Sequence, residues 1–86
     1  MTITEFNQKW SNHLEEGHYG LSIDLKEVIE FLDLNFKLLE EEYPEFTYSQ
    51  IKIKWASANV YLSNASKEWA DKLEEGIEEI LWRLEN

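Results

Sequence analysis

Residues 46–63 read FTYSQIKIKWASANVYLS, and this stretch decides between two folds. Apolar residues alternate with polar ones along it, and they are Phe46, Tyr48, Ile51, Ile53, Trp55, Ala58, Val60 and Leu62. A period of two predicts strands, so we expect a β-hairpin that turns near Ala56, Ser57 and Ala58. A four-three spacing from Ile51 to Trp69 would instead favour a helix and an all-α bundle. The richness in β-branched and aromatic residues favours the strands.

The first sixteen residues have the pattern of a short helix. Thr2 and Glu5 have the spacing of a capping box, and apolar residues then recur every three or four positions up to Leu14. We expect this helix to end near Glu16, with Gly17 as a left-handed cap and residues 18–20 as a connector.

A second helix is expected from about residue 25 to residue 43. Asp24 stands at the N-cap position with Glu27 three residues on, and Pro44 disfavours helical geometry at Tyr43. The predicted core stripe comprises Leu25, Val28, Ile29, Leu32, Phe36, Leu39 and Tyr43. A second apolar strip on the opposite side comprises Phe31, Leu34 and Leu38. This strip either packs within the domain or forms a homodimer interface.

Asn64 or Ser66 is expected to cap a last helix. Its predicted inward face comprises Trp69, Ala70, Leu73, Ile77, Ile80, Leu81 and Leu84. The chain is therefore predicted to be one α+β domain, residues 1–86, in the order helix, helix, hairpin, helix, with the helices packed on one face of the hairpin. An isolated hairpin is marginal, so we expect it to lean on the helices through Ile51, Ile53, Trp55, Val60 and Leu62.

The charge of the chain is strongly negative and unevenly distributed. Eighteen acidic residues face eight basic ones, for a net charge of −10, and residues 46–64 contain no carboxylate. Such a charge repels nucleic acid and anionic lipid, so we expect neither direct nucleic-acid binding nor a membrane partner. The chain has no cysteine and no apolar run of the roughly 18 residues that span a membrane. A cytoplasmic location is the expectation.

Catalytic and metal-binding patterns are weak. The chain has no Ser-His-Asp spacing, phosphate-binding glycine loop or zinc-protease helix, so we predict no enzymatic activity and no cofactor. His13, Glu16 and His18 form the one His/carboxylate cluster. A closed metal site needs three or four ordered ligands, so we predict no metal.

A short resemblance covers Gln50-Ile51-Lys52-Ile53-Lys54-Trp55 followed by Val60-Tyr61. This motif resembles a pattern in uncharacterised small phage and bacterial proteins, although Ala56 and Ala58 stand where glycines usually follow. The resemblance implies a strand–turn–strand–helix unit and a mobile-element origin. It implies no activity.

The carboxylates of the last helix predict a partner-binding surface. An advance of 100° per residue places most of them opposite the core stripe, with a tryptophan among them. The predicted partner-binding residues are Glu68, Asp71, Glu75, Glu78, Glu79 and Trp82, with Glu40, Glu41 and Glu42 from the preceding helix. Tryptophan is favoured at interface hot spots, whereas a solubilising face with a tryptophan folded onto a neighbouring element is the plain structural interpretation.

These features lead to two hypotheses of function. The first is an acidic, phage-type inhibitor that acts as a nucleic-acid mimic. It would present its carboxylates to the basic, nucleic-acid-binding surface of a partner such as a host defence nuclease, as in anti-CRISPR and other anti-defence proteins. The alternative is an assembly module that forms a homodimer through Phe31, Leu34 and Leu38 and has no inhibitory role.

Overall fold

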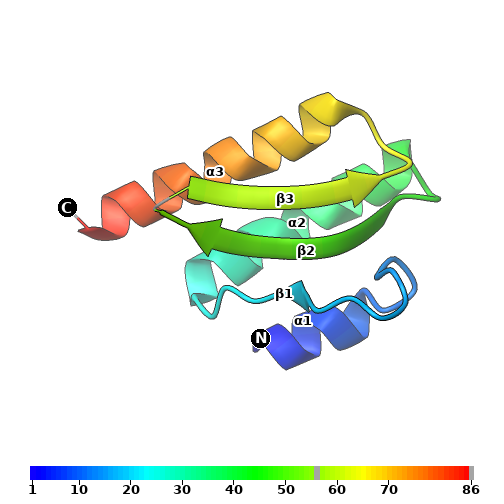
Figure 1. Cartoon of the computed structure of the whole chain (residues 1–86), viewed down its shortest axis with the longest axis horizontal. Helices are drawn as coiled ribbons and strands as arrows, with labels where there is room; N and C mark the ends of the chain where they lie inside the picture. Colours follow the sequence, from blue (N-terminus) through cyan, green and yellow to red (C-terminus); the bar gives the residue numbers. More distant parts are fainter. Residues whose placement is uncertain (56, 86) are drawn as a thin grey trace.

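The alternating stretch forms the predicted hairpin. The computed structural model describes residues 1–55 and 57–85, and in it β2 (Thr47–Lys54) pairs antiparallel with β3 (Ser57–Ser63) (Figure 1). The alternation changes parity between Tyr48 and Ile51, and the strand register shifts at the same place, as in a β-bulge. Both side chains are therefore buried on the same face of the sheet. The hairpin prediction is confirmed, and the all-helical alternative is wrong.

The hairpin turns earlier than expected. Trp55 adopts a left-handed backbone conformation with φ of 55°, while Ser57 and Ala58 already belong to β3. Ala56, the first of the three expected turn residues, lies outside the described residues. Ile53 and Trp55 were expected to pack on the helices, but both are exposed because they lie at the tip of the hairpin.

A third strand was not predicted. β1 (Gly20–Leu21) begins at the last residue of the expected connector and pairs parallel with β2, and the sheet order is β1-β2-β3. At the outer edge of β1, Asn7 Oδ1 accepts a hydrogen bond from the Leu21 N–H at 3.0 Å, and Asn7 Nδ2 donates to the Leu21 carbonyl at 3.1 Å. The side-chain amide thus replaces a neighbouring strand. Gly20 has φ of 73°, and a side chain there would collide with Asn7.

The first helix begins as predicted and ends early. α1 (Ile3–Lys9) has the capping box, in which Thr2 Oγ1 accepts from the Glu5 N–H at 3.1 Å and Glu5 Oε1 accepts from the Thr2 N–H at 2.8 Å. The predicted end near Glu16 is wrong, because the chain beyond the helix bonds to β2. Tyr48 N–H donates to the His13 carbonyl at 2.8 Å. Gly17 is left-handed, with φ of 81°, but it lies in a turn and does not cap α1.

The second helix differs from the prediction at its start. α2 (Lys26–Glu42) has Leu25 at its N-cap position and no side-chain cap, so the predicted Asp24 cap is wrong. Leu25 is consequently exposed and does not join the core stripe. The helix ends at Glu42, with Tyr43 as C-cap, as Pro44 predicts.

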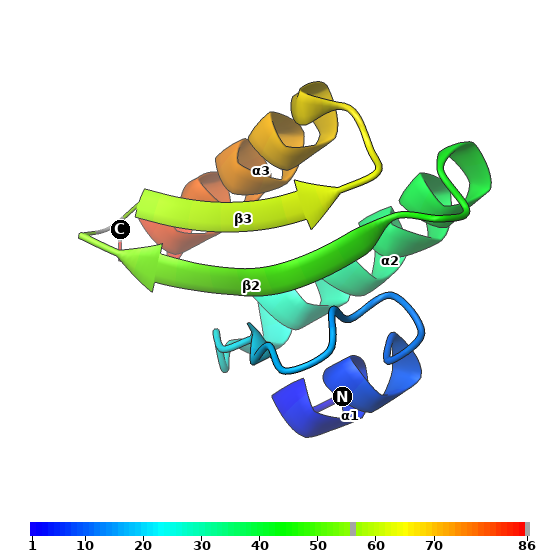
Figure 2. The same cartoon turned by 45° about the vertical axis from the view of Figure 1, so that its right-hand side comes forward.

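The last helix, α3 (Lys67–Glu85), runs antiparallel to α2, and both lie behind the hairpin in Figure 1 while α1 flanks β1. The turned view in Figure 2 shows the same arrangement, with the C-terminal end of α3 beside the β2–β3 turn. Trp69, Leu73, Ile77 and Ile80 are buried as predicted, whereas Leu84 is exposed.

The core is centred on one aromatic ring. Phe36 of α2 lies with its ring centroid between 5.1 and 5.4 Å from those of four other aromatic residues, which are Phe6, Trp10, Phe46 and Tyr48. α1, α2 and β2 therefore meet at this ring.

The elements form a small α+β domain. Within residues 1–55 and 57–85 it has three helices and a mixed three-stranded sheet in the order α-β-α-β-β-α. The radius of gyration of 12.0 Å equals the value of about 12 Å expected for a compact chain of this length. In this part of the chain, none of the helices has both the length and the apolar character to cross a membrane.

Candidate interaction surface

Two carboxylates of α3 accept hydrogen bonds from the open edge of the sheet. In the part of the chain that the structure describes, β3 is an edge strand that pairs with β2, so alternate N–H groups point away from β2. Glu78 Oε2 accepts from the Ala58 N–H and Glu74 Oε2 from the Val60 N–H, both at 2.9 Å. Glu78 was predicted to bind a partner, but in the structure it accepts a hydrogen bond from the backbone of β3. Glu74, one helical turn earlier, has the same role.

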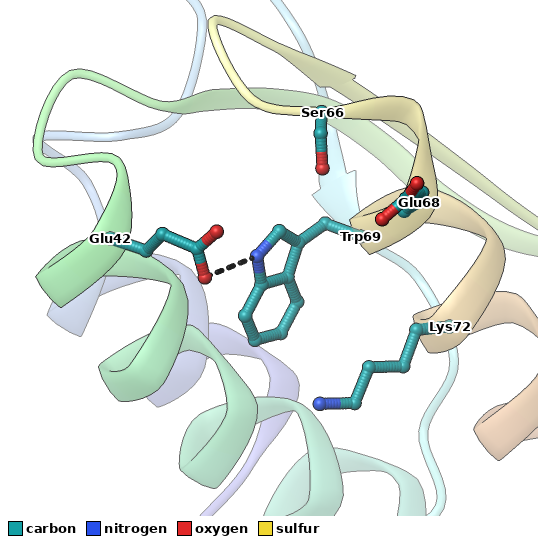
Figure 3. Close-up of a pocket in the computed structure, with 5 residues that line it drawn as sticks. All are labelled: Glu42, Ser66, Glu68, Trp69 and Lys72. Atoms are coloured by element: carbon teal, nitrogen blue, oxygen red, sulfur yellow. Dashed lines mark hydrogen bonds between the residues drawn. The ribbon is translucent and has the colours of Figure 1, made fainter.

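The predicted carboxylates at the end of α2 are also partly engaged. Glu40 Oε2 lies 2.7 Å from His13 Nε2, and Glu42 Oε2 accepts a hydrogen bond from Trp69 Nε1 at 3.1 Å (Figure 3). Glu41 lies between them, is exposed, and has no hydrogen bond or ion pair to any residue that the structure describes. Of the three, Glu41 is the one available to a partner without loss of an internal contact.

His13 has a structural environment. Its Nδ1 lies 2.8 Å from the Phe46 carbonyl oxygen, and its ring stacks on the Phe46 ring with centroids 4.1 Å apart. His18 instead lies 3.7 Å from a carboxylate oxygen of Glu15. Across residues 1–55 and 57–85, no three His, Cys, Asp or Glu side chains are placed to hold a metal ion together. The cluster of His13, Glu16 and His18 is therefore not assembled.

Two polar groups tie α1 to the rest of the domain. Asp33 Oδ1 accepts from Trp10 Nε1 at 3.0 Å and lies 2.8 Å from Lys9 Nζ. Partial burial favours the neutral form of Asp33, but the hydrogen bonds from Lys9 and Trp10 outweigh it and hold the pKa of this carboxyl below its ordinary value. Burial also raises the pKa of Tyr48, whose hydroxyl donates to Asn7 Oδ1 at 2.9 Å.

Four of the five remaining carboxylates of α3 form a row along the helix. Glu68, Asp71, Glu75 and Glu79 are exposed, and within the described part of the chain none of them has a hydrogen bond or ion pair. Steps of three and four residues place them on one face of the helix, and the next step leads to Trp82, which is 65% exposed. We call these five residues the outer strip. It spans about 21 Å along the helix axis, at 1.5 Å per residue.

A hollow lies at each end of the outer strip. The first, of about 250 Å³, is lined by Glu42, Ser66, Glu68, Trp69 and Lys72 (Figure 3). In this hollow, Lys72 Nζ lies 4.5 Å from the centre of the Trp69 ring. The second, of about 430 Å³, is lined by Ile53, Glu78, Leu81, Trp82 and Glu85. The strip thus runs from a polar hollow, shared with the end of α2, to a hollow that contains three apolar residues.

The second apolar strip of α2 is divided by the fold. Phe31 packs against α3 at Gly76, where any side chain would overlap its ring. Leu34 and Leu38 remain exposed, at 62% and 48%. Of the two interpretations of this strip, packing within the domain is therefore correct for Phe31.

No family model, curated protein or solved structure matches this chain. The fold and the surface define an acidic α+β domain with a carboxylate strip on one helix.

The sequence analysis did not identify Glu74 as an edge cap, that is, a side chain that accepts a hydrogen bond from the open edge of β3. It also did not identify Ile53, Leu81 and Glu85 as lining the second hollow, a groove beside Trp82. The spacing of Glu78 and Glu85 around Trp82, four residues before and three after, could have indicated two of the groove residues. Nothing in the sequence indicates that the tip of β2 joins them.

Proposed function

We propose that this protein is an acidic protein-binding inhibitor. Its outer strip docks on the basic, nucleic-acid-binding surface of a partner, such as a host defence nuclease, and so competes with nucleic acid. One observation carries the proposal. In the described residues, four exposed carboxylates without a hydrogen bond or ion pair lie in a single row that ends in a tryptophan that is 65% exposed.

The charge density of α3 supports mimicry of a nucleic-acid strand. α3 carries seven carboxylates. The four in the outer strip are spaced on average about 5.5 Å apart along the helix axis, compared with about 3.4 Å per phosphate along one DNA strand. Three basic residues, Lys67, Lys72 and Arg83, reduce the net charge of this helix to −4. α3 therefore presents to a phosphate-binding partner a row of negative charges that is weaker than that of a DNA strand.

The mechanism has two parts. Clustered carboxylates attract a basic surface over about a Debye length, near 10 Å at 0.1 M salt, and so raise the association rate. Trp82 then contributes apolar contact, which lengthens the residence time of the complex. The mobile-element origin that the resemblance of residues 50–61 implies fits a target in a host cell.

The homodimer alternative has less support. With Phe31 packed on Gly76, the proposed interface retains Leu34 and Leu38. Specific interfaces bury about 1,000 Å² or more in total, which two leucines cannot provide. Light scattering at micromolar concentration tests this alternative directly, because an assembly module has to be at least dimeric.

The proposal is tested by capture and competition. Wild-type protein immobilised on beads is expected to retain a nucleic-acid-binding protein from bacterial lysate, and both salt and added duplex DNA or RNA should release it. A bait in which Glu68, Glu75 and Glu79 become Gln and Asp71 becomes Asn should retain much less. If nucleic acid does not compete with the captured protein, the mimicry proposal fails.

A further inference from the structure

The groove at the C-terminal end of the outer strip has a mixed chemical character. Ile53 from the tip of β2 and Leu81 from α3 provide aliphatic surface, and Trp82 provides an aromatic face. Glu78 and Glu85 complete the lining of this space of about 430 Å³. We call it the C-terminal groove. A ligand that fits it has an apolar stem and a charged or polar head.

The electrostatics of the groove select a cation. Two carboxylates line it, and no basic side chain does so among the described residues. Glu78 uses Oε2 for the Ala58 N–H, but a carboxylate has capacity for further hydrogen bonds at both oxygens. The groove also lies at the last turns of α3, where the helix dipole places partial negative charge.

The nearest basic residue of α3 does not fill the groove. Arg83 follows Trp82 by one residue and Leu81 by two, so it lies about 100° and 200° around the helix from them. It is exposed and is not part of the groove lining. Among the described residues, no basic side chain of this chain therefore lines the groove.

We propose that the C-terminal groove binds an arginine side chain of the partner. The methylene stem packs against Ile53 and Leu81, the planar guanidinium stacks on the Trp82 indole, and its N–H groups donate to Glu85 and to Glu78. Arginine suits these contacts better than lysine, because its flat, weakly hydrated head both stacks on aromatic rings and forms forked hydrogen bonds to carboxylates.

This inference rests on the proposed function for the origin of the arginine. Surfaces that bind nucleic acid are rich in arginine, since guanidinium groups bind phosphates and bases. The outer strip would then attract the basic surface of the partner electrostatically. The groove would bind one arginine of that surface and so set how the two proteins are positioned. The groove itself can be tested without a partner.

The test is a titration with N-acetyl-arginine amide, with N-acetyl-lysine amide and the neutral isostere N-acetyl-citrulline amide as comparisons. Binding is followed through the indole N–H signal of Trp82 in ¹⁵N NMR spectra, identified by its loss in the Trp82→Phe variant. We expect a saturable shift with arginine and a Kd of about 1–10 mM, as suits so small a ligand. Lysine amide should bind several-fold more weakly, and citrulline amide should not shift the signal.

Two matched variants separate the groove from general charge attraction. Glu85→Gln should weaken arginine binding about fivefold or more, whereas Glu75→Gln, on the same helix but outside the groove, should leave it within about twofold. Equal losses in the two variants, an equal shift by citrulline amide, or no saturable shift would overturn the inference.

The outcome is independent of the proposed inhibitor function. Arginine binding with the expected pattern establishes the groove even if no partner depends on the outer strip. A partner that requires the strip while arginine amide fails to bind refutes the groove and leaves the inhibitor proposal standing.

Discussion

The edge of β3 offers the sharpest prediction about stability. Replacing Glu74 and Glu78 together by Ala removes the two carboxylates that accept the Val60 and Ala58 N–H groups at 2.9 Å. A hydrogen bond to a charged group contributes about 1.5–3 kcal/mol. Because this edge is partly exposed, water replaces some of that loss, and we expect about 1–1.5 kcal/mol per carboxylate.

The double variant should therefore lose about 2–3 kcal/mol of unfolding free energy, a large part of the roughly 4–13 kcal/mol that a chain of this length has. That loss corresponds to a fall of about 10–20 °C in melting temperature. Glu75 and Glu79 provide the matched control, since their replacement by Ala changes the same charge on the same helix and removes no hydrogen bond or ion pair within the described part of the chain. Their double variant should stay within about 0.5 kcal/mol of wild type.

The assay is urea unfolding followed by circular dichroism, at a salt concentration high enough to screen long-range charge. Amide hydrogen exchange adds a local readout, because the Ala58 and Val60 N–H groups should lose protection in the first variant alone. The freed edge should also promote self-association, visible by light scattering. Equal stability losses in the two double variants would refute the assignment of Glu74 and Glu78 as edge caps.

Three further predictions concern packing and pH. Asn7→Ala leaves buried partners without hydrogen bonds and should cost about 2–3 kcal/mol in chemical unfolding, whereas Asn7→Ser tests whether a small polar group rescues part of the loss. Gly76→Ala should cost about 1–3 kcal/mol by overpacking against Phe31, and adding Phe31→Leu should restore part of the stability; an unchanged melting temperature of the single variant would contradict this contact. Because the pKa of Asp33 is below its ordinary value in the folded protein, its contribution is present above the unfolded pKa near 3.9 and is lost as the pH falls below it. In Asp33→Asn, urea unfolding between about pH 7 and pH 3 should show a smaller loss of stability than in wild type, and identical pH profiles would refute the role of Lys9 and Trp10 as its partners.

The hairpin was predicted from the alternating run of apolar residues. Its bulge was not predicted, although the alternation changes parity between Tyr48 and Ile51, where the strand register shifts. β1 was not predicted either, since two residues carry no periodicity and Gly20 reads as a connector. The early end of α1 has a similar cause. The backbone of His13 pairs with Tyr48, which lies 35 positions further along the chain, and local pattern cannot report such pairing.

The candidate surface was predicted in its position but not in its detail. Helical periodicity placed the carboxylates of α3 outside the core, and it located Trp82 among them. Helical periodicity could not show that Glu78 contacts the sheet while Glu79 faces solvent. Both are glutamates, and each follows another glutamate by four residues. The difference arises from β3, whose open edge faces one of them and not the other.

The central claim is that the outer strip, and not negative charge in general, binds the partner. The direct test is the Kd of the captured partner for two variants that neutralise four carboxylates each. One neutralises Glu68, Asp71, Glu75 and Glu79, and the other neutralises Glu16, Asp24, Glu27 and Glu30, which are exposed elsewhere. Our account predicts that the strip variant binds about tenfold or more weakly and that the other stays within about threefold of wild type. Equal losses of affinity in the two variants would contradict it.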